Sequence, residues 1–176
     1  MYLFWESEAC LSRRCRGGSL MRRARIARPP GVSMLSSKAK YAVRAAIYLA
    51  RQEHPDRWSP TVDIATQEAI PRKFLEAIFV ALRDCGLVDS RRGALGGHRL
   101  ARPATAITVA DIIRVIDGPL ALTPCASVTR FAPCTDCVDV ESCSLQHLMR
   151  AARDAVAGVL ENCSLARLAA DAMGDD

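Results

Sequence analysis

The sequence is poor in aromatic residues and has no long hydrophobic run. Phe, Trp and Tyr make up only 5% of the 176 residues, whereas half of all residues are hydrophobic. We therefore expect a core built mainly from Ala, Leu, Ile and Val. No apolar run approaches the roughly 20 residues of a membrane-spanning helix, so we expect no membrane segment.

Export signals and catalytic signatures are also missing. Arginines interrupt the N-terminal segment throughout, and no apolar stretch of about 7–15 residues follows them, which argues against a secretory signal. We therefore expect a cytoplasmic protein whose thiols stay reduced. The sequence has no Ser/His/Asp constellation, phosphate-binding loop or dinucleotide fingerprint, so we do not expect an enzyme.

Positive charge, by contrast, is concentrated in the first 102 residues. Residues 1–33 and residues 34–102 each carry a formal net charge of +5, whereas residues 103–176 carry −5. A basic part followed by an acidic part indicates a nucleic-acid partner; an unspecific distribution of surface charge is the alternative. Residues 1–33 show no helical or strand period. We interpret them as a disordered basic arm, or as an artefact of an upstream start codon, because Met34 opens a sequence that looks complete.

Apolar residues at helical spacing predict three helices, over 38–52, 61–68 and 71–85, with Ser36 or Ser37 as the first N-cap. The second helix is expected to bury Val62, Ile64 and Ala65. The third has an apolar repeat of three and four residues: Phe74, Leu75, Ile78, Phe79 and Leu82. A tight turn joins the second helix to this amphipathic third helix, which starts with Arg72 and Lys73. This arrangement is typical of a helix-turn-helix.

A basic hairpin follows the third helix. We expect short strands over 87–90 and 99–101, on either side of a glycine-rich turn over 91–98. Arg91 and Arg92 lie at the tip, where arginine side chains can reach a phosphate or the minor groove. Arg99 on the returning strand completes the expected DNA-contacting set. A solvated hairpin without DNA contacts is the alternative.

The segment 104–172 is expected to hold an effector loop and a dimerisation helix. Helices are predicted over 107–116, 144–162 and 164–172, and Thr108 and Asp111 predict a capping box at the first of them. The long helix 144–162 has a broad apolar face and no partner helix of its own length. Pairing with the same helix of a second copy would bury that face in a two-fold dimer; packing on the chain's own core is the alternative.

Four cysteines lie in the predicted loop before the long helix: Cys125, Cys134, Cys137 and Cys143, spaced C-x8-C-x2-C-x5-C. Thiolates suit zinc or iron–sulfur clusters, so the spacing predicts a metal site. Zinc sites usually use two C-x2-C pairs, and only Cys134 and Cys137 form one. Disulfides and a thiol-redox enzyme are further alternatives. A reducing compartment argues against the first, and the missing βαβ context argues against the second.

A string of spaced residues carries a family resemblance. It runs Ala69-Ile70-Pro71, Phe74-Leu75-Glu76, Leu82, Gly86-Leu87-Val88, Ser90, Gly93, Gly96-Gly97 and Leu100-Ala101-Arg102. This string resembles the Rrf-two family of bacterial regulators (IscR/NsrR/RirA-type), and the similarity runs from about residue 34 to residue 170. The resemblance implies a mainly α fold, with a winged helix-turn-helix over 34–103 and a long C-terminal dimerisation helix.

The resemblance also implies a function. Family members are homodimers that bind palindromic operators, and many carry a [2Fe–2S] or [4Fe–4S] cluster that senses iron status, nitric oxide or redox state. Their recognition helix corresponds to 71–83 and their wing to 87–100. Within that helix, Glu76 matches a residue that contributes to sequence specificity. Zinc in place of the cluster, giving a DNA-binding or interaction module without redox sensing, is the alternative.

The family's ligand positions fall on Cys125, Cys137 and Cys143, and Cys134 is an additional cysteine in a longer loop. Some members use a His three residues after the last cysteine, where this chain has Gln146. Other members have an acidic ligand at a position where this chain has Lys40, which cannot bind a metal. These two departures favour Cys134 as the fourth ligand. Outside the loop, Cys85 is expected to be a small buried hydrophobe. His98 takes a wing position where the family often has an aromatic residue.

Overall fold

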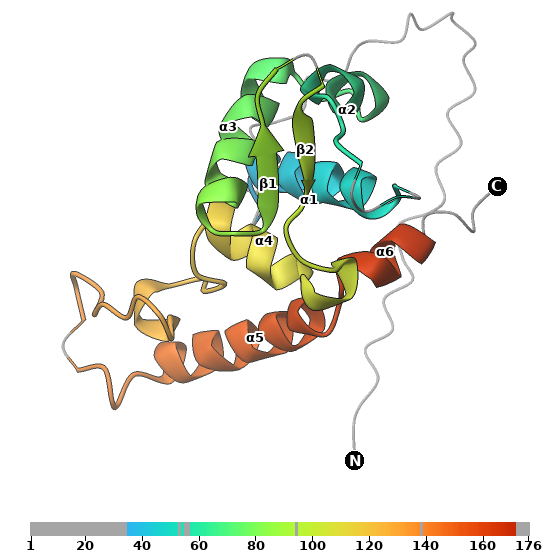
Figure 1. Cartoon of the computed structure of the whole chain (residues 1–176). Coiled ribbons are helices and arrows are strands. Elements are labelled where there is room, and N and C mark those ends of the chain that lie inside the picture. Colours follow the sequence, from blue (N-terminus) through green and yellow to red (C-terminus); the bar gives the residue numbers. More distant parts are fainter. Residues whose placement is uncertain (1–34, 53, 55–56, 94, 138, 172–176) are drawn as a thin grey trace, which may run out of the picture. The chain divides into compact units, whose positions relative to one another are not determined.

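The computed structural model describes residues 35–52, 54, 57–93, 95–137 and 139–171 (Figure 1). The expected arm over residues 1–33 lies outside this part. The elements, in chain order, are α1 (Ser37–Ala50), α2 (Thr61–Gln67), α3 (Arg72–Asp84), β1 (Val88–Arg91), β2 (Gly97–Leu100), η1 (Ala104–Ala106), α4 (Val109–Ile116), η2 (Pro124–Ala126), α5 (Ser144–Glu161) and α6 (Leu165–Asp171). The part of the chain that the structure describes is thus mainly helical with one small hairpin, as the sequence predicts.

Local capping rules account for the helix starts. The Ser36 hydroxyl accepts a hydrogen bond from the Ala39 amide at 2.9 Å, so Ser36 is the N-cap of α1. Thr108 and Asp111 form the expected capping box at the start of α4. The Ser36 amide also donates to the carboxylate of Asp117, at the end of α4, at 2.9 Å. The two helices are therefore joined at their ends.

One continuous core joins the helix-turn-helix to the C-terminal part of the chain. Buried residues of α1, α2, α3, α4 and α6 meet in it, among them Ala42, Ala45, Ala46, Ile64, Leu75, Ile78, Phe79, Leu82, Ile112 and Leu165. The alanines of α1 let the neighbouring helices approach closely, which explains how a core with few aromatic residues is filled.

Two burial expectations are wrong, those for Val62 and Cys85, and one member of the predicted apolar repeat is exposed. That member is Phe74, which is 50% exposed because it lies about 100° around α3 from Leu75 and outside the buried stripe, in an edge-to-face contact with the Tyr41 ring. Val62 is also half-exposed, since α2 buries only Ile64 fully. Cys85 is exposed rather than buried, because it follows the last turn of α3 where the chain leaves the core.

The wing is a two-stranded antiparallel hairpin that begins and ends within two residues of the expected positions. Its register pairs Val88 with Leu100 at the base and Arg91 with Gly97 near the tip. A third segment joins β2, because the Ser59 amide donates to the His98 carbonyl at 2.9 Å and the His98 amide donates back at 2.8 Å. Gly97 is required here, since a Cβ atom would lie 2.3 Å from the Ser59 carbonyl oxygen.

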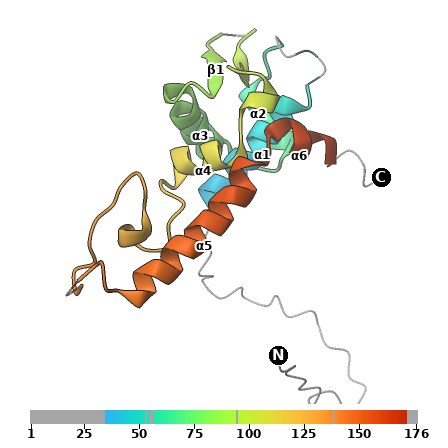
Figure 2. The ribbon, with the colours of Figure 1, turned by 90° about the horizontal axis from the view of Figure 1, so that it is seen from below.

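The long helix α5 lies against α4 and η2, with the cysteine loop at its N-terminal end (Figure 2). Its C-terminal end is fixed to the core, because the Val109 amide donates to the Cys163 carbonyl at 3.0 Å and Arg114 forms an ion pair with Glu161. The single chain leaves Leu145, Leu148 and Val159 of its apolar face exposed. No helix in the described residues is long and apolar enough to cross a membrane.

Candidate DNA-binding surface and cysteine cluster

The exposed face of α3 carries the first group of predicted site residues. Arg72, Lys73 and Glu76 are all exposed in its first turns, and the Arg72 Nε atom lies 2.9 Å from a carboxylate oxygen of Glu76. An exposed pair at this i, i+4 spacing contributes only about 0.3–0.5 kcal/mol. The two side chains can therefore exchange this ion pair for other partners at little cost.

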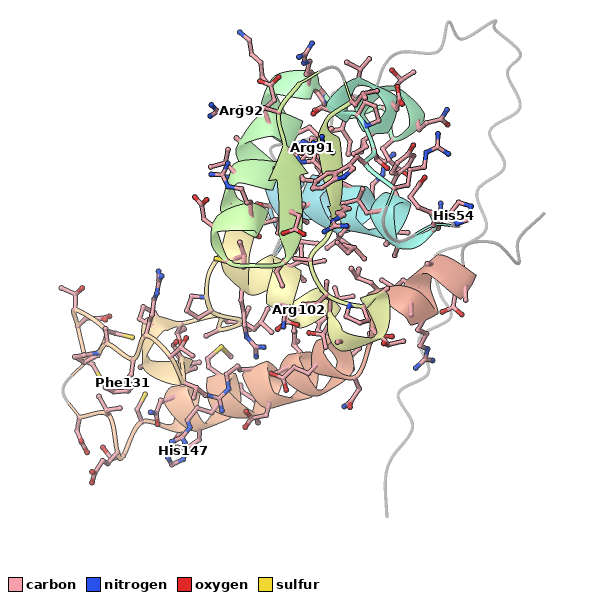
Figure 3. All side chains as sticks on the ribbon, viewed as in Figure 1. His54, Arg91, Arg92, Arg102, Phe131 and His147 are labelled. Atoms are coloured by element: carbon pink, nitrogen blue, oxygen red, sulfur yellow. The ribbon has the colours of Figure 1, made fainter. Side chains whose placement is uncertain are left out.

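The three predicted arginines of the wing lie in two different environments. Arg91 and Arg92 are exposed at the tip end of the hairpin (Figure 3). Arg99, in contrast, is part of a packed cluster: its guanidinium lies 4.8 Å from the centre of the Trp58 ring and 3.3 Å from the carboxylate of Asp89 across the hairpin. The structure therefore places Arg99 beside the body of the protein and not at the tip.

His98 is a wing residue whose contacts the sequence does not reveal. Its ring lies flat on the Phe79 ring of α3, with centroids 3.8 Å apart and an interplanar angle of 13°. Its Nε2 atom is 3.0 Å from the Thr61 hydroxyl, and its Nδ1 atom is 2.8 Å from the Ser90 hydroxyl. Burial, with a smaller effect from Arg83, lowers the pKa of His98 to about 4, so the ring is neutral at pH 7.

The four predicted ligand cysteines lie around the start of α5. Cys125 is buried in η2, Cys134 and Cys137 are partly exposed in the loop, and Cys143 directly precedes the first residue of α5. The Cys134 and Cys125 sulfur atoms are 3.7 Å apart. All four are free thiols. The disulfide alternative therefore has no support in this part of the chain.

The donor set fits a thiolate-ligated centre in its chemistry and in one of its distances. Two thiolates bound to one tetrahedral ion at about 2.3 Å each lie about 3.8 Å apart, close to the Cys125–Cys134 separation. Burial and the neighbouring charges of Cys143 and Cys125 raise the pKa of the Cys137 thiol, and a bound cation relieves such repulsion. Among the described residues, however, no three Cys, His, Asp or Glu side chains converge on one metal position.

Two side chains of α5 hold the Cys125 end of the loop, and sequence reasoning missed both. Gln146 is 6% exposed, and its Nε2 atom donates to the Cys125 carbonyl at 3.2 Å. Arg153 donates from Nη1 to the Ala126 carbonyl at 2.7 Å. The sequence signal was Gln146 itself, at a position where the family resemblance implies a histidine ligand in some members. It anchors the backbone of a cysteine here.

The two candidate sites lie far apart in the molecule. In Figures 1 and 2 the wing and the start of α3 are at one end, and the cysteine loop projects beyond the N-terminal end of α5 at the other. Figure 3 shows Phe131 and His147 on this loop side, away from Arg91 and Arg92. Within the chain, α4 contacts both α3 and α5 and so connects the two ends.

Sequence comparisons match the chain to a family of regulators. Residues 35–171 match the family described as "Rrf2: Iron-dependent Transcriptional regulator". The HTH-type transcriptional regulator IscR of Photorhabdus laumondii is 35% identical over 136 residues, which cover 76% of this chain and 77% of that protein.

Solved structures show the same fold. CymR, the global cysteine regulator of B. subtilis, has a TM-score of 0.61 and 33% identity, covering 77% of this chain and 95% of that chain. IscR of T. potens has a TM-score of 0.61 and 29% identity, covering 78% of this chain and 87% of that chain. These relatives are transcriptional regulators and not enzymes, as expected from the sequence. The chain belongs to the Rrf2 family of winged-helix DNA-binding transcriptional regulators.

Proposed function

We propose that the chain is a homodimeric, cytoplasmic regulator that binds a palindromic operator and senses iron, nitric oxide or redox state through an iron–sulfur cluster. One observation carries this proposal: four free thiols surround the start of the helix that packs on the DNA-binding core, and two of their sulfur atoms are 3.7 Å apart. The family's description as iron-dependent regulators supports iron as the metal.

DNA binding is assigned to α3 and the wing. With α3 in the major groove, Arg72 and Lys73 at its start are placed to contact phosphates and base edges, and Glu76 to accept from a cytosine amino group. Arg91 and Arg92 at the wing tip extend to the neighbouring backbone or minor groove. Arg99 contributes from the side of the hairpin, where it is held by Asp89 and Trp58.

The dimer is assigned to α5. Leu148 is 61% exposed, and Leu145 and Val159 on the same helix are also exposed. Isologous packing of two such helices would remove these side chains from water and relate the two α3 helices by a two-fold axis. A palindromic operator then follows from the symmetry of the dimer. In this proposal the segment 34–103 binds DNA, and the segment 104–172 holds the sensing loop and the dimerisation helix. Both segments contribute to one core.

The cluster is assigned to Cys125, Cys134, Cys137 and Cys143. When bound, it supplies a centre whose assembly and oxidation state depend on iron, oxidants and nitric oxide. The chain's own residues link this centre to DNA binding. Gln146 and Arg153 fix one end of the loop to α5, and Cys143 fixes the other end to its first turn. A change in the loop therefore shifts α5 against its dimer partner and alters the spacing of the two α3 helices.

The test is the metal content of full-length protein purified without oxygen. We expect iron and acid-labile sulfide together with a visible absorption band. Zinc without sulfide and without visible absorption would contradict the sensor and support the alternative, a zinc-stabilised DNA-binding module. If the purified protein contains neither iron nor zinc and still binds DNA, the proposed metal site is wrong.

A further inference from the structure

His98 of β2 contacts three other elements, α2, α3 and β1. It belongs to β2, its ring stacks on Phe79 of α3 at 3.8 Å, and its two nitrogens reach hydroxyls of α2 and β1. We propose that His98 is a positioning residue that sets the wing relative to the recognition helix, so that the tip arginines and α3 engage DNA together. This inference rests on the DNA-binding surface assigned above.

The wing needs such a device because it is small. Each strand has four residues, and an isolated two-stranded hairpin is marginally stable at best. Buried Val88 secures the base of the hairpin. His98 pairs with Ser90, only one pair before the Arg91–Gly97 pair that leads into the tip. The contacts of His98 therefore restrain the hairpin next to its tip, where Arg91 and Arg92 lie.

The ring orientation is fixed from several sides. Hydroxyl groups can donate or accept, so the Thr61 and Ser90 hydroxyls satisfy both nitrogens of a neutral imidazole in either tautomer. The backbone of His98 is held as well, through its two hydrogen bonds to Ser59. A phenylalanine at this position would keep the stacking on Phe79 but lose both hydroxyl partners. Histidine supplies the stacking and the two tethers at once.

The test compares the salt dependence of DNA binding among full-length variants. The probe is a duplex of about 30 base pairs, selected from a random pool by the unaltered chain, which is long enough for two half-sites and their flanks. The variants are His98→Leu, which removes the stacking and both tethers, and the nearly isosteric Thr61→Val, which removes one tether. His54→Leu is the matched control, because His54 is an exposed histidine outside the wing (Figure 3).

The reference is the double variant Arg91→Ala with Arg92→Ala. Loss of two phosphate contacts per chain, four per dimer, should reduce the slope of log affinity against log salt by about 3.6, since each contact contributes about 0.9. We expect His98→Leu to reduce the slope by a comparable amount and Thr61→Val by a smaller amount. Adding the arginine substitutions to His98→Leu should then reduce it little further. His54→Leu should leave the slope unchanged.

The outcomes separate this inference from the proposed function. The slope reports the contacts made by folded, active protein, so partial unfolding of His98→Leu lowers the active fraction without imitating the effect. If the arginine variant flattens the slope while His98→Leu and Thr61→Val do not, the positioning role is wrong and the wing surface stands. If the arginine variant itself leaves the slope unchanged, both the wing surface and the role of His98 are overturned.

Discussion

Replacing Gln146 with leucine should release the buried end of the cysteine loop. The substitution keeps the apolar bulk of the side chain but removes the hydrogen bond from Nε2 to the Cys125 carbonyl, which measures 3.2 Å. Because Gln146 and Cys125 are both 6% exposed, the carbonyl has no ready access to water. Leaving a buried acceptor without its partner costs about 1–3 kcal/mol. Local opening of the loop should become more favourable by this amount.

The assay is alkylation of the Cys125 thiol in reduced, metal-free, full-length protein. If alkylation requires local opening, its rate should rise about 5-fold for 1 kcal/mol and roughly 150-fold for 3 kcal/mol. Peptide mass spectrometry separates Cys125 from the other cysteines. Cys134 and Cys137 are already partly exposed and should react at nearly unchanged rates, which provides an internal control.

His147→Leu is the matched control variant, because His147 is the exposed neighbour of Gln146 on the same helix. It should leave the rate at Cys125 unchanged. The hydrogen bond from Arg153 to the adjacent Ala126 carbonyl, 2.7 Å in the unaltered chain, is not removed by either substitution. Alkylation of Cys125 at the same rate in Gln146→Leu and in the unaltered chain would refute the anchoring role.

Three further predictions concern the dimer, the wing and acid stability. Leu148→Glu should dissociate the dimer in size-exclusion chromatography with light scattering, because burying an unpaired charge costs several kcal/mol; a variant that stays dimeric would show that this face packs elsewhere. Gly97→Ala should lower the melting temperature, since its Cβ atom would lie 2.3 Å from the Ser59 carbonyl oxygen, and an unchanged value would show that the hairpin can move away from Ser59. Because the pKa of His98 falls from 6.5 to about 4 on folding, its contribution to stability is complete above pH 6.5 and is lost as the pH falls towards 4. His98→Phe should therefore flatten the pH dependence of the unfolding free energy in this window, and an identical pH profile would contradict the assignment.

Local sequence rules predicted the elements and their ends well. The cap at Ser36 and the capping box of Thr108 and Asp111 involve residues only three positions apart, so the pattern contains all the partners. Helix periodicity identified the buried stripe of α3 for the same reason. Burial at the margin of a stripe depends on which other elements cover it. This explains why Cys85 was wrongly expected to be buried and why Phe74 of the apolar repeat is half-exposed.

The missed residues all have partners far away in the sequence. His98 contacts Thr61 across 37 positions, Gln146 contacts Cys125 across 21 and Arg153 contacts Ala126 across 27. No periodicity or spacing rule in a single sequence reports such pairs. The four cysteines could be predicted as ligands because their residue type carries the chemistry, and this stays a prediction. The two side chains that anchor their loop have no such signature.

The central claim is that the cysteine cluster controls DNA binding, and the most direct measurement compares Cys143→Ala with Cys85→Ala. Both remove one thiol, but Cys143 directly precedes α5 whereas Cys85 is exposed at the end of α3. Each variant is purified without oxygen, and its visible absorption and its affinity for the selected duplex are measured together. The account predicts that Cys143→Ala loses the chromophore and changes the affinity, while Cys85→Ala does neither. A Cys143→Ala variant that keeps both the chromophore and the unaltered affinity would contradict it.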